Sequence, residues 1–223
     1  MRTRSPCAAK PFIVRHQKHQ KHALPRGVQG NWLCRKVFEA AGWEVISVDV
    51  EAKFEPTYCV DVLKWDYWQY PPGHFDYVHL SPPCTEYSRA MTSRPRNLAL
   101  GDSLVDKALE ILVYFRPRWW TLENPYTGML KSRPAMQHLK PFMQRVCYCK
   151  YSEGDDTWSY RKETAIWTNL KWNPRPLCHR DSPCQWFNGK AHPIEAQHLA
   201  RVRLYSMPPA LIREWLAAIL AEL

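Results

Sequence analysis

The chain has 223 residues, of which 45% are hydrophobic and 23% charged, and its formal net charge is +10. This length is sufficient for one domain with a full α/β core. No run of about 18 apolar residues is present, which excludes a transmembrane helix, and the first residues lack the apolar region of a secretory signal. The eight cysteines follow no disulfide pattern, so we expect a reducing compartment. The excess of positive charge predicts a polyanionic partner.

The basic charge is concentrated at the start of the chain. Met1–Arg26 contains seven Lys and Arg residues and no acidic residue, with His16, His19 and His22 among them. Two interpretations are open: an arm that binds nucleic acid through phosphate contacts, or a disordered tail of little consequence. The neighbouring lysines disfavour a metal site at the three histidines. We predict a disordered basic arm over residues 1–26 and one folded domain over residues 27–223.

The first predicted elements of this domain are a helix and a strand. Residues 31–41 have the apolar spacing of a helix that ends at Gly42, and residues 44–50 form a strand that ends in Asp49, with Glu51 close behind. An acidic residue at the end of the second strand of a Rossmann-like unit commonly binds a ribose. Asp49 and the later Asp61 are therefore candidate nucleotide ligands; the alternative is that both are surface acids at loop starts.

A cysteine follows the next predicted strand. Residues 75–80 are apolar and aromatic, and the turn Ser81-Pro82-Pro83 ends the strand and delivers Cys84. Ligands of open α/β sheets bind at this end of the strands. The two prolines restrict the backbone before Cys84, which suits a nucleophile held in one position. The alternative is a cysteine packed in a small core.

A second strand carries a carboxyl group to the same predicted edge. Residues 119–122 form an apolar strand that is followed by Glu123-Asn124-Pro125, and residues 102–116 form an amphipathic helix between the two strands. Strand–helix–strand units in a parallel sheet are right-handed crossovers. Cys84 and Glu123 are therefore expected to face one crevice.

The rest of the chain is less regular. We predict a strand over residues 145–151, a short irregular lobe over about 126–200, and a C-terminal helix over 208–223 that packs on the sheet. Cys178, Cys184 and His192 are the candidate zinc ligands of the lobe, with His179, His198, Cys147 and Cys149 as further contributors. Their spacing is not that of a standard zinc finger, and thiols without metal are commoner, so no metal is expected.

Two of these motifs carry a family resemblance. Pro83-Cys84-x-x-Tyr87-Ser88 resembles the Pro-Cys-x-x-Phe-Ser motif of DNA cytosine-5 methyltransferases, and Glu123-Asn124-Pro125 is similar to their Glu-Asn-Val motif. The order and separation of the motifs resemble the small phage and viral branch of that family. The resemblance implies a Rossmann-like α/β fold that uses S-adenosylmethionine, with a small irregular C-terminal lobe. It also implies DNA as substrate, a flipped target cytosine, and no membrane partner.

The resemblance further implies residue roles. The Cys84 thiolate would add to carbon 6 of the cytosine, and protonated Glu123 would hydrogen-bond to ring nitrogen 3, with Pro83 and Asn124 as neighbours in the catalytic motifs. Arg161 or Lys162 would favour the thiolate. The residues expected to bind S-adenosylmethionine are Gly30, Asp49, Glu51, Asp61 and Pro82, and those expected to bind the substrate are Ser88, Arg89, Arg161, Lys162 and Thr164.

One segment departs from the family pattern. The family's first strand ends in Phe-x-Gly-x-Gly, whereas Val28–Trp32 retains only Gly30 and has Trp32 at the second glycine position. Pro11–Val14 is the nearby candidate for that strand. Three functions therefore stay open: DNA cytosine-5 methylation, RNA cytosine-5 methylation, and nucleic-acid binding by an inactive homologue. We expect a monomer that is not secreted, in the cytoplasm of a bacterium or phage-infected cell, or in the nucleus for a eukaryotic or viral protein.

Overall fold

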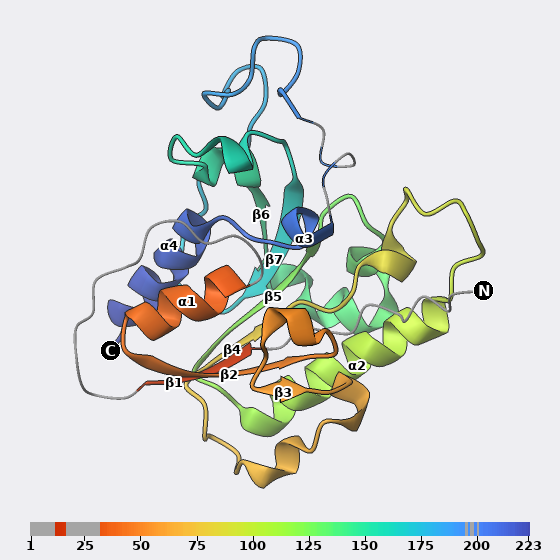
Figure 1. Ribbon diagram of the computed structural model, residues 1–223, viewed down its shortest axis with the longest axis vertical. Helices are drawn as coiled ribbons and strands as arrows, with labels where there is room; N and C mark the ends of the chain where they lie inside the picture. Colours follow the sequence, from red (N-terminus) through yellow and green to blue (C-terminus); the bar gives the residue numbers. More distant parts are fainter. Residues whose placement is uncertain (1–11, 17–31, 195, 197–198, 200) are drawn as a thin grey trace.

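The structure is a computed structural model that describes residues 12–16, 32–194, 196, 199 and 201–223 (Figure 1). Its described strands form one sheet in the order β3-β2-β1-β4-β5-β7-β6. The strands are β1 (Phe12–His16), β2 (Trp43–Asp49), β3 (Tyr58–Cys59), β4 (Tyr77–Leu80), β5 (Trp119–Pro125), β6 (Met143–Cys147) and β7 (Glu163–Thr168). The helices are α1 (Trp32–Ala40), α2 (Leu98–Phe115), α3 (Arg201–Leu204) and α4 (Pro209–Leu220). The protein is thus a mixed α/β protein.

Strand direction is mixed within this sheet. β2 pairs with β3 in parallel, and β4 pairs with β5 in parallel. β7 lies between β5 and β6 and runs antiparallel to both. β1 lies between β2 and β4 and is antiparallel to each. The carboxyl ends of β2, β3, β4 and β5 therefore lie at one edge of the sheet, where their following loops gather.

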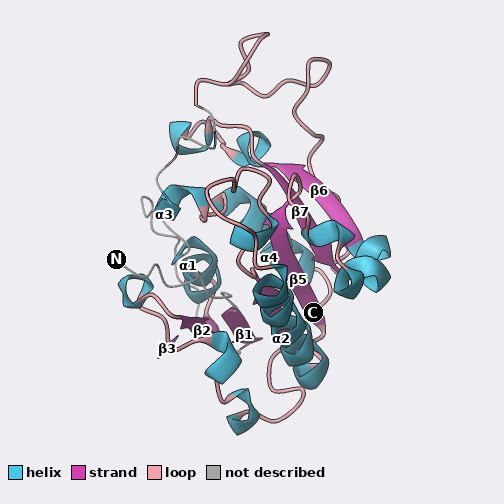
Figure 2. Ribbon diagram, turned by 90° about the vertical axis from the view of Figure 1, so that its right-hand side faces the viewer, coloured by secondary structure: helices cyan, strands magenta, loops and turns pink. Residues whose placement is uncertain are grey.

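Helices cover both faces of the sheet (Figure 2). On one face α1 and α4 pack together over a core that includes Phe38, Tyr77 and Trp215. On the other face α2 packs over a core that includes Val78 and Ile111. Neighbouring side chains of β4 thus enter different cores, which is why all four residues of the strand are buried, including the polar His79. No helix in the described part of the chain is long and apolar enough to span a membrane.

Most predicted elements are found close to their expected positions. The helix predicted from Asp102 begins earlier, at Leu98, because the side chain of Asn97 caps it by accepting a hydrogen bond from the Leu100 amide at 3.0 Å. The strand predicted over 145–151 ends at Cys147, and Tyr148–Tyr151 form a 3₁₀ turn. The turn places Tyr148 and Tyr151 in the same buried cluster, whereas a strand of alternating side chains would direct residues three apart to opposite faces.

The expected disordered arm is wrong for Phe12–His16, which form β1. Ile13 lies opposite Ile46 of β2 and opposite Val78 of β4. A backbone inserted between two strands satisfies its amide and carbonyl groups on both sides, which stabilises this segment in the sheet. The other residues of the predicted arm, and Gly30, lie outside the described residues. The division of the chain at residue 26 stays a prediction.

Candidate active site

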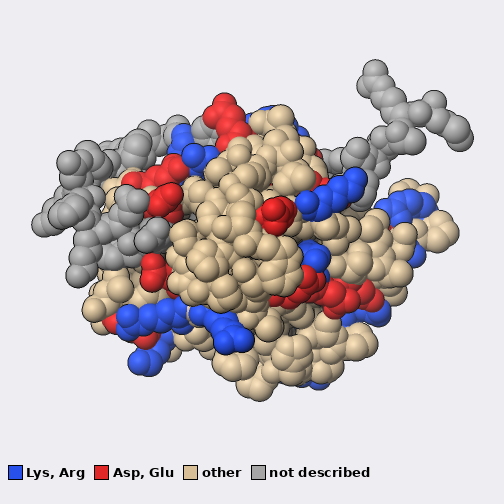
Figure 3. All heavy atoms as spheres, turned by 90° about the horizontal axis from the view of Figure 1, so that it is seen from below, with Lys and Arg blue, Asp and Glu red and all other residues tan. Residues whose placement is uncertain are grey.

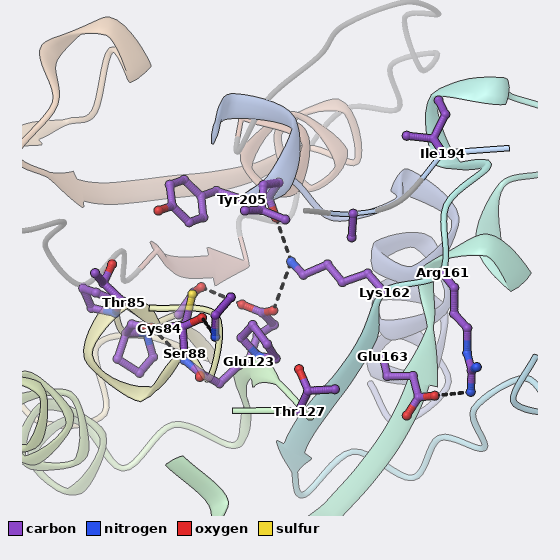
Figure 4. A pocket seen from close by; sticks show the side chains of 18 of the residues that line it. Cys84, Thr85, Ser88, Glu123, Thr127, Arg161, Lys162, Glu163, Ile194 and Tyr205 are labelled. Atoms are coloured by element: carbon purple, nitrogen blue, oxygen red, sulfur yellow. Dashed lines mark hydrogen bonds and ion pairs between the residues drawn. The ribbon is translucent and has the colours of Figure 1, made fainter. Parts of the chain in front are cut away.

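A cavity of about 470 Å³ opens where β4 and β5 end (Figure 4). Its floor is formed by the loop after β4 and by the last residues of β5, including Pro83, Cys84, Glu123 and Asn124. The segment that leads into β7 provides a second wall, and the irregular lobe provides a third. A concave site of this size is within the range that encloses a small molecule or a single base.

The register between β4 and β5 brings the two predicted reactive groups to this cavity. Leu80 lies opposite Leu122, so the next residues, Ser81 and Glu123, follow side by side. The Asn124 side chain donates from Nδ2 to the Pro82 carbonyl at 2.8 Å, which ties the cysteine loop to the end of β5. Cys84 and Glu123 both line the cavity, and Cys84 is half-buried.

Glu123 is buried and is held by three polar groups. The Ser81 hydroxyl donates to Oε2 at 2.8 Å, and the Tyr148 hydroxyl donates to Oε1 at 3.3 Å. The Lys162 ammonium lies 3.8 Å from Oε1. Burial raises the pKa of Tyr148 above its usual range, so this phenol remains a neutral donor. The carboxyl group of Glu123 is therefore oriented from two sides.

The wall before β7 carries the two cations that were predicted here. Lys162 is nearly buried, donates to the Leu204 carbonyl at 2.8 Å, and lies 4.7 Å from the centre of the Tyr148 ring. Arg161 lines the cavity but forms its ion pair with Glu163. In Figure 4, Lys162 points toward Glu123, while Arg161 and Glu163 lie to one side. Thr164 is different: it is buried within β7, opposite Pro125 and Val146, and does not line the cavity.

The loop after Cys84 is anchored to α2. The Tyr87 hydroxyl donates to Asp102 at 2.9 Å, and Arg133 forms an ion pair with the same carboxylate. Gly101 of α2 packs closely against Tyr87. A Cβ atom at position 101 would lie only 3.0 Å from the Tyr87 ring, so a larger residue would require a shift. The turn that follows Cys84 is therefore fixed by buried contacts on its far side.

The two predicted substrate contacts in this loop have different positions. Ser88 lines the cavity, whereas Arg89 is exposed. The pKa of Lys131 is lowered, first by burial and then by the positive charges of Arg89 and Arg145. Arg145 also stacks on Tyr126, with its guanidinium carbon 4.0 Å from the ring centre. Arg89, Lys131 and Arg145 thus form a basic group that we call the basic rim.

The three acidic residues predicted to bind the cofactor lie at the same edge of the sheet, but apart from the cavity. Asp49 ends β2, is buried, and accepts from the Glu51 amide at 2.9 Å. Glu51 forms an ion pair with Lys53. Asp61 follows β3 and accepts from the Leu63 amide at 3.0 Å. Pro82 lines the cavity, and the three acidic residues do not. Gly30 is outside the described residues.

The direction of β1 changes the geometry expected next to these acids. His16 lies opposite Trp43, at the start of β2, and Phe12 lies opposite Ser47, near its end. The last residue of β1 is thus at the edge of the sheet remote from Asp49. β1 therefore does not run toward Asp49, as the first strand of the family pattern would.

The candidate zinc ligands also come together. The ligand atoms of Cys178, Cys184 and His192 gather with that of Cys149, all within 4.8 Å of one another. His179 is exposed and accepts from the Asp181 amide at 3.3 Å, so it belongs to a turn instead. His198 is outside the described residues. His192 lines the cavity as well, which links this cluster to the candidate active site.

Sequence reasoning missed two partners of Glu123. Local sequence patterns identify Ser81 only as a turn residue. Pairing Leu80 with Leu122 in a parallel register predicts that Ser81 lies beside Glu123. Tyr148 had no such signal, because it reaches Glu123 from the 3₁₀ turn after β6, 25 residues along the chain. Only the packing of the turn against β5 reveals that contact.

These observations define a class of protein: an α/β protein with a thiol and a buried carboxyl group at the ends of two adjacent parallel strands, in one cavity. The probable DNA (cytosine-5)-methyltransferase of Frog virus 3 (isolate Goorha) is 30% identical over 202 residues, which cover 78% of this chain and 89% of the viral protein. No protein-family model matches the sequence. The identity and coverage show that the chain belongs to the viral branch of the DNA cytosine-5 methyltransferase family.

Proposed function

We propose that the protein transfers a methyl group from S-adenosylmethionine to carbon 5 of a cytosine in DNA. The observation that supports the proposal is the cavity that Cys84 and Glu123 both line, which brings a thiol and a carboxyl group to one space. The family membership supports the same chemistry. A cytosine enters such a cavity only after leaving the stacked duplex, so base flipping is part of the proposal.

Cys84 is the proposed nucleophile. Its thiolate forms a bond from sulfur to carbon 6 of the ring, which moves the electron pair of the 5,6 double bond toward carbon 5 and the ring nitrogen. Carbon 5 would then take the methyl group that S-adenosylmethionine supplies, and the bond between that methyl group and the sulfonium sulfur would break to leave S-adenosylhomocysteine. Loss of the carbon-5 proton to a base and cleavage of the bond between sulfur and carbon 6 restore the aromatic ring and release the thiolate. The Pro82-Pro83 turn holds the sulfur at one point during these steps.

Glu123 is the proposed partner of ring nitrogen 3. A hydrogen bond from its carboxyl group to this nitrogen stabilises the negative charge that develops when sulfur adds to carbon 6. Ser81 and Tyr148 keep the two oxygens of Glu123 at defined positions, 2.8 Å and 3.3 Å from their hydroxyl groups. Lys162 adds a positive charge on the same side of the cavity. These contacts preorganise the carboxyl group before the base arrives.

The proposed cofactor is S-adenosylmethionine, which supplies an electrophilic methyl group. The residues that would hold it are Asp49, Glu51, Asp61 and Pro82, with Gly30 from the part of the chain that is not described. Asp49 and Asp61 fit this role because the paired strands β2 and β3 bring both carboxylates to the sheet edge that also carries Cys84. Ribose hydroxyls and an adenine amine are groups that such carboxylates bind.

The proposed fold is Rossmann-like. The strand order β3-β2-β1-β4-β5 is that of a doubly wound sheet, whose ligands bind beyond the carboxyl ends of the strands. The antiparallel β1 departs from this pattern. That departure favours a second candidate function, nucleic-acid binding by a homologue that does not transfer methyl groups. The reason is that β1 ends at the edge of the sheet remote from Asp49.

DNA is the proposed macromolecular substrate. The basic rim of Arg89, Lys131 and Arg145 lies beside the loop after Cys84, and its exposed member, Arg89, is proposed to contact a phosphate. Arg145 is paired with Glu163, and Lys131 donates to the carbonyls of Tyr126 and Gly128, so both add positive charge near that contact. The face in Figure 3, by contrast, carries Lys and Arg interspersed with Asp and Glu around a broad uncharged area. A polyanion is therefore expected at the rim of the cavity and not on that face.

The decisive experiment measures 5-methylcytosine by mass spectrometry after incubating the full chain with DNA and S-adenosylmethionine. Cys84→Ala should abolish the product, whereas Cys59→Ser, which alters an exposed cysteine outside the cavity, should retain it. DNA that contains 5-fluorocytosine should trap the wild-type protein covalently, because the ring then has no carbon-5 proton to lose.

The same assay separates the alternatives. Methylation of RNA but not DNA would replace the proposed substrate. A folded protein that binds DNA but neither S-adenosylmethionine nor S-adenosylhomocysteine in a calorimetric titration would support the inactive homologue. Weaker binding after Asp49→Ala would support the proposed cofactor site.

A further inference from the structure

Three cysteines and one histidine converge in the irregular lobe. Cys149 comes from the 3₁₀ turn after β6, Cys178 and Cys184 flank a short bridge between His179 and Ser182, and His192 follows eight residues after Cys184. One ligand atom from each of the four lies within 4.8 Å of the other three. The cysteines are buried and the histidine is half-buried.

The distances within this cluster match a common centre. His192 Nε2 lies 3.5 Å from Cys178 Sγ and 3.3 Å from Cys184 Sγ. A tetrahedral zinc ion with Zn–S bonds of about 2.3 Å and Zn–N bonds of about 2.0–2.1 Å requires S–N separations of about 3.5 Å. These two separations between sulfur and nitrogen are therefore close to those around a bound ion.

The surroundings of one sulfur also suit a thiolate that binds metal. The Cys184 amide points at Cys178 Sγ, with nitrogen and sulfur 3.4 Å apart. Backbone amides that donate to a ligating sulfur orient it and stabilise its negative charge. The ligand set itself, three thiolates and one imidazole, is one that zinc takes in structural sites.

A metal centre at this cluster would stabilise the lobe. In the described part of residues 169–200 there is no α-helix or strand, and the apolar side chains that pack against the cysteines, Leu177, Trp186 and Phe187, are only partly buried. A segment with so little regular structure and apolar contact of its own gains stability from a covalent or metal cross-link. A disulfide would use two of the four buried thiols of this cluster, which includes Cys147, and would leave the other two and the imidazole without a partner ion.

We propose that Cys149, Cys178, Cys184 and His192 bind one Zn²⁺ ion in a closed, structural site. Four protein ligands fill the tetrahedron, so no position remains for water or substrate. The ion would join the lobe to the turn after β6, which also carries Tyr148, the partner of Glu123. Since Ala191 and His192 line the cavity, the zinc site would also fix the wall that faces Cys84.

The test is a metal analysis of the full chain, purified without a polyhistidine tag and with its thiols reduced. About one zinc per chain is expected by mass spectrometry of the metal. Exchange with Co²⁺ should produce the intense absorption of a tetrahedral thiolate complex, which the histidines near the N-terminus cannot produce because they provide no sulfur. Less than a tenth of a zinc per chain, together with no such Co²⁺ spectrum after reconstitution, would overturn the proposal.

Variants identify the ligands. Cys178→Ser and Cys184→Ser should each lower the zinc content at least tenfold, while Cys34→Ser and Cys59→Ser, at positions outside the cluster, should keep it. Zinc retained by both ligand variants would contradict the assignment. If a ligand variant does not fold, the wild-type Co²⁺ spectrum and its loss on chelation decide the question without it.

Discussion

Lys162 and Glu123 face each other across the edge of the cavity, with the ammonium nitrogen 3.8 Å from Oε1 and both side chains less than a tenth exposed. Both side chains are removed from water, so each depends on the other and on its hydrogen bonds. Lys162 also donates to the Leu204 carbonyl, which couples the segment after the lobe to the candidate catalytic carboxyl group.

The first prediction concerns the energy of this pair. A double-mutant cycle with Glu123→Gln and Lys162→Met should give a coupling free energy between about 0.5 and 3 kcal/mol in urea unfolding, because the groups are close and buried. The matched control is the pair Lys171–Glu222, which has a similar separation of 3.7 Å but an exposed lysine. Its cycle should give about 0–1 kcal/mol. Equal coupling in the two cycles would refute the argument from burial.

The second prediction concerns Ser81. Ser81→Ala removes the hydroxyl that donates to Glu123 at 2.8 Å, and should lower kcat for methyl transfer about tenfold, since a hydrogen bond to such a group contributes about 1.5 kcal/mol. Ser103→Ala changes an exposed serine on α2 and serves as the control. An unchanged kcat with an intact fold would show that Ser81 does not position Glu123.

The third prediction concerns the basic rim. Arg89→Gln should reduce the slope of log K against log salt concentration for DNA binding by about one, because one phosphate contact is lost. The loss should be similar for DNA of any sequence, as phosphate contacts carry no base information. Lys171→Gln removes an exposed cation next to Glu222, outside the cavity, and should leave the slope unchanged. Fluorescence anisotropy at several salt concentrations measures both.

The fourth prediction concerns pH and the loop after Cys84. The pKa of Asp102 is lowered, chiefly by its ion pair with Arg133. A carboxyl group with a lower pKa in the folded protein stabilises the fold at pH values above its unfolded pKa of about 3.9, and this stabilisation is lost as the pH falls through the folded pKa. Asp102→Asn should therefore destabilise the protein by about 1–2 kcal/mol at neutral pH.

The difference between wild type and Asp102→Asn should begin to shrink as the pH falls below about 4, where the carboxyl group of the unfolded chain takes up a proton, and should disappear below the lowered pKa of the folded protein. Asp106→Asn, an exposed aspartate one turn further along α2, is the control and should change stability little. Urea unfolding between acidic and neutral pH measures all three proteins. A difference in unfolding free energy that stays constant across this pH range would show that Asp102 does not stabilise the protein through its ion pair with Arg133.

Much of the fold was predictable from local patterns. The apolar run before Ser81 and the prolines after it located β4 and its end, and helical spacing located α2 and α4. The helix start at Leu98 and the 3₁₀ turn at Tyr148–Tyr151 were not predicted, since the first depends on a side-chain cap and the second on which buried cluster each residue joins.

Local strand, turn and helix signals were enough to predict that a cysteine and a glutamate stand at the ends of two strands joined by a helix. The partners of these two residues depend on contacts between segments that are distant in the chain. The register of β4 and β5 set Ser81 beside Glu123, and packing brought Tyr148 and Lys162 to the same carboxyl group. The placement of β1 and the convergence of Cys149 with His192 likewise join segments far apart in the chain, and no local pattern records such contacts.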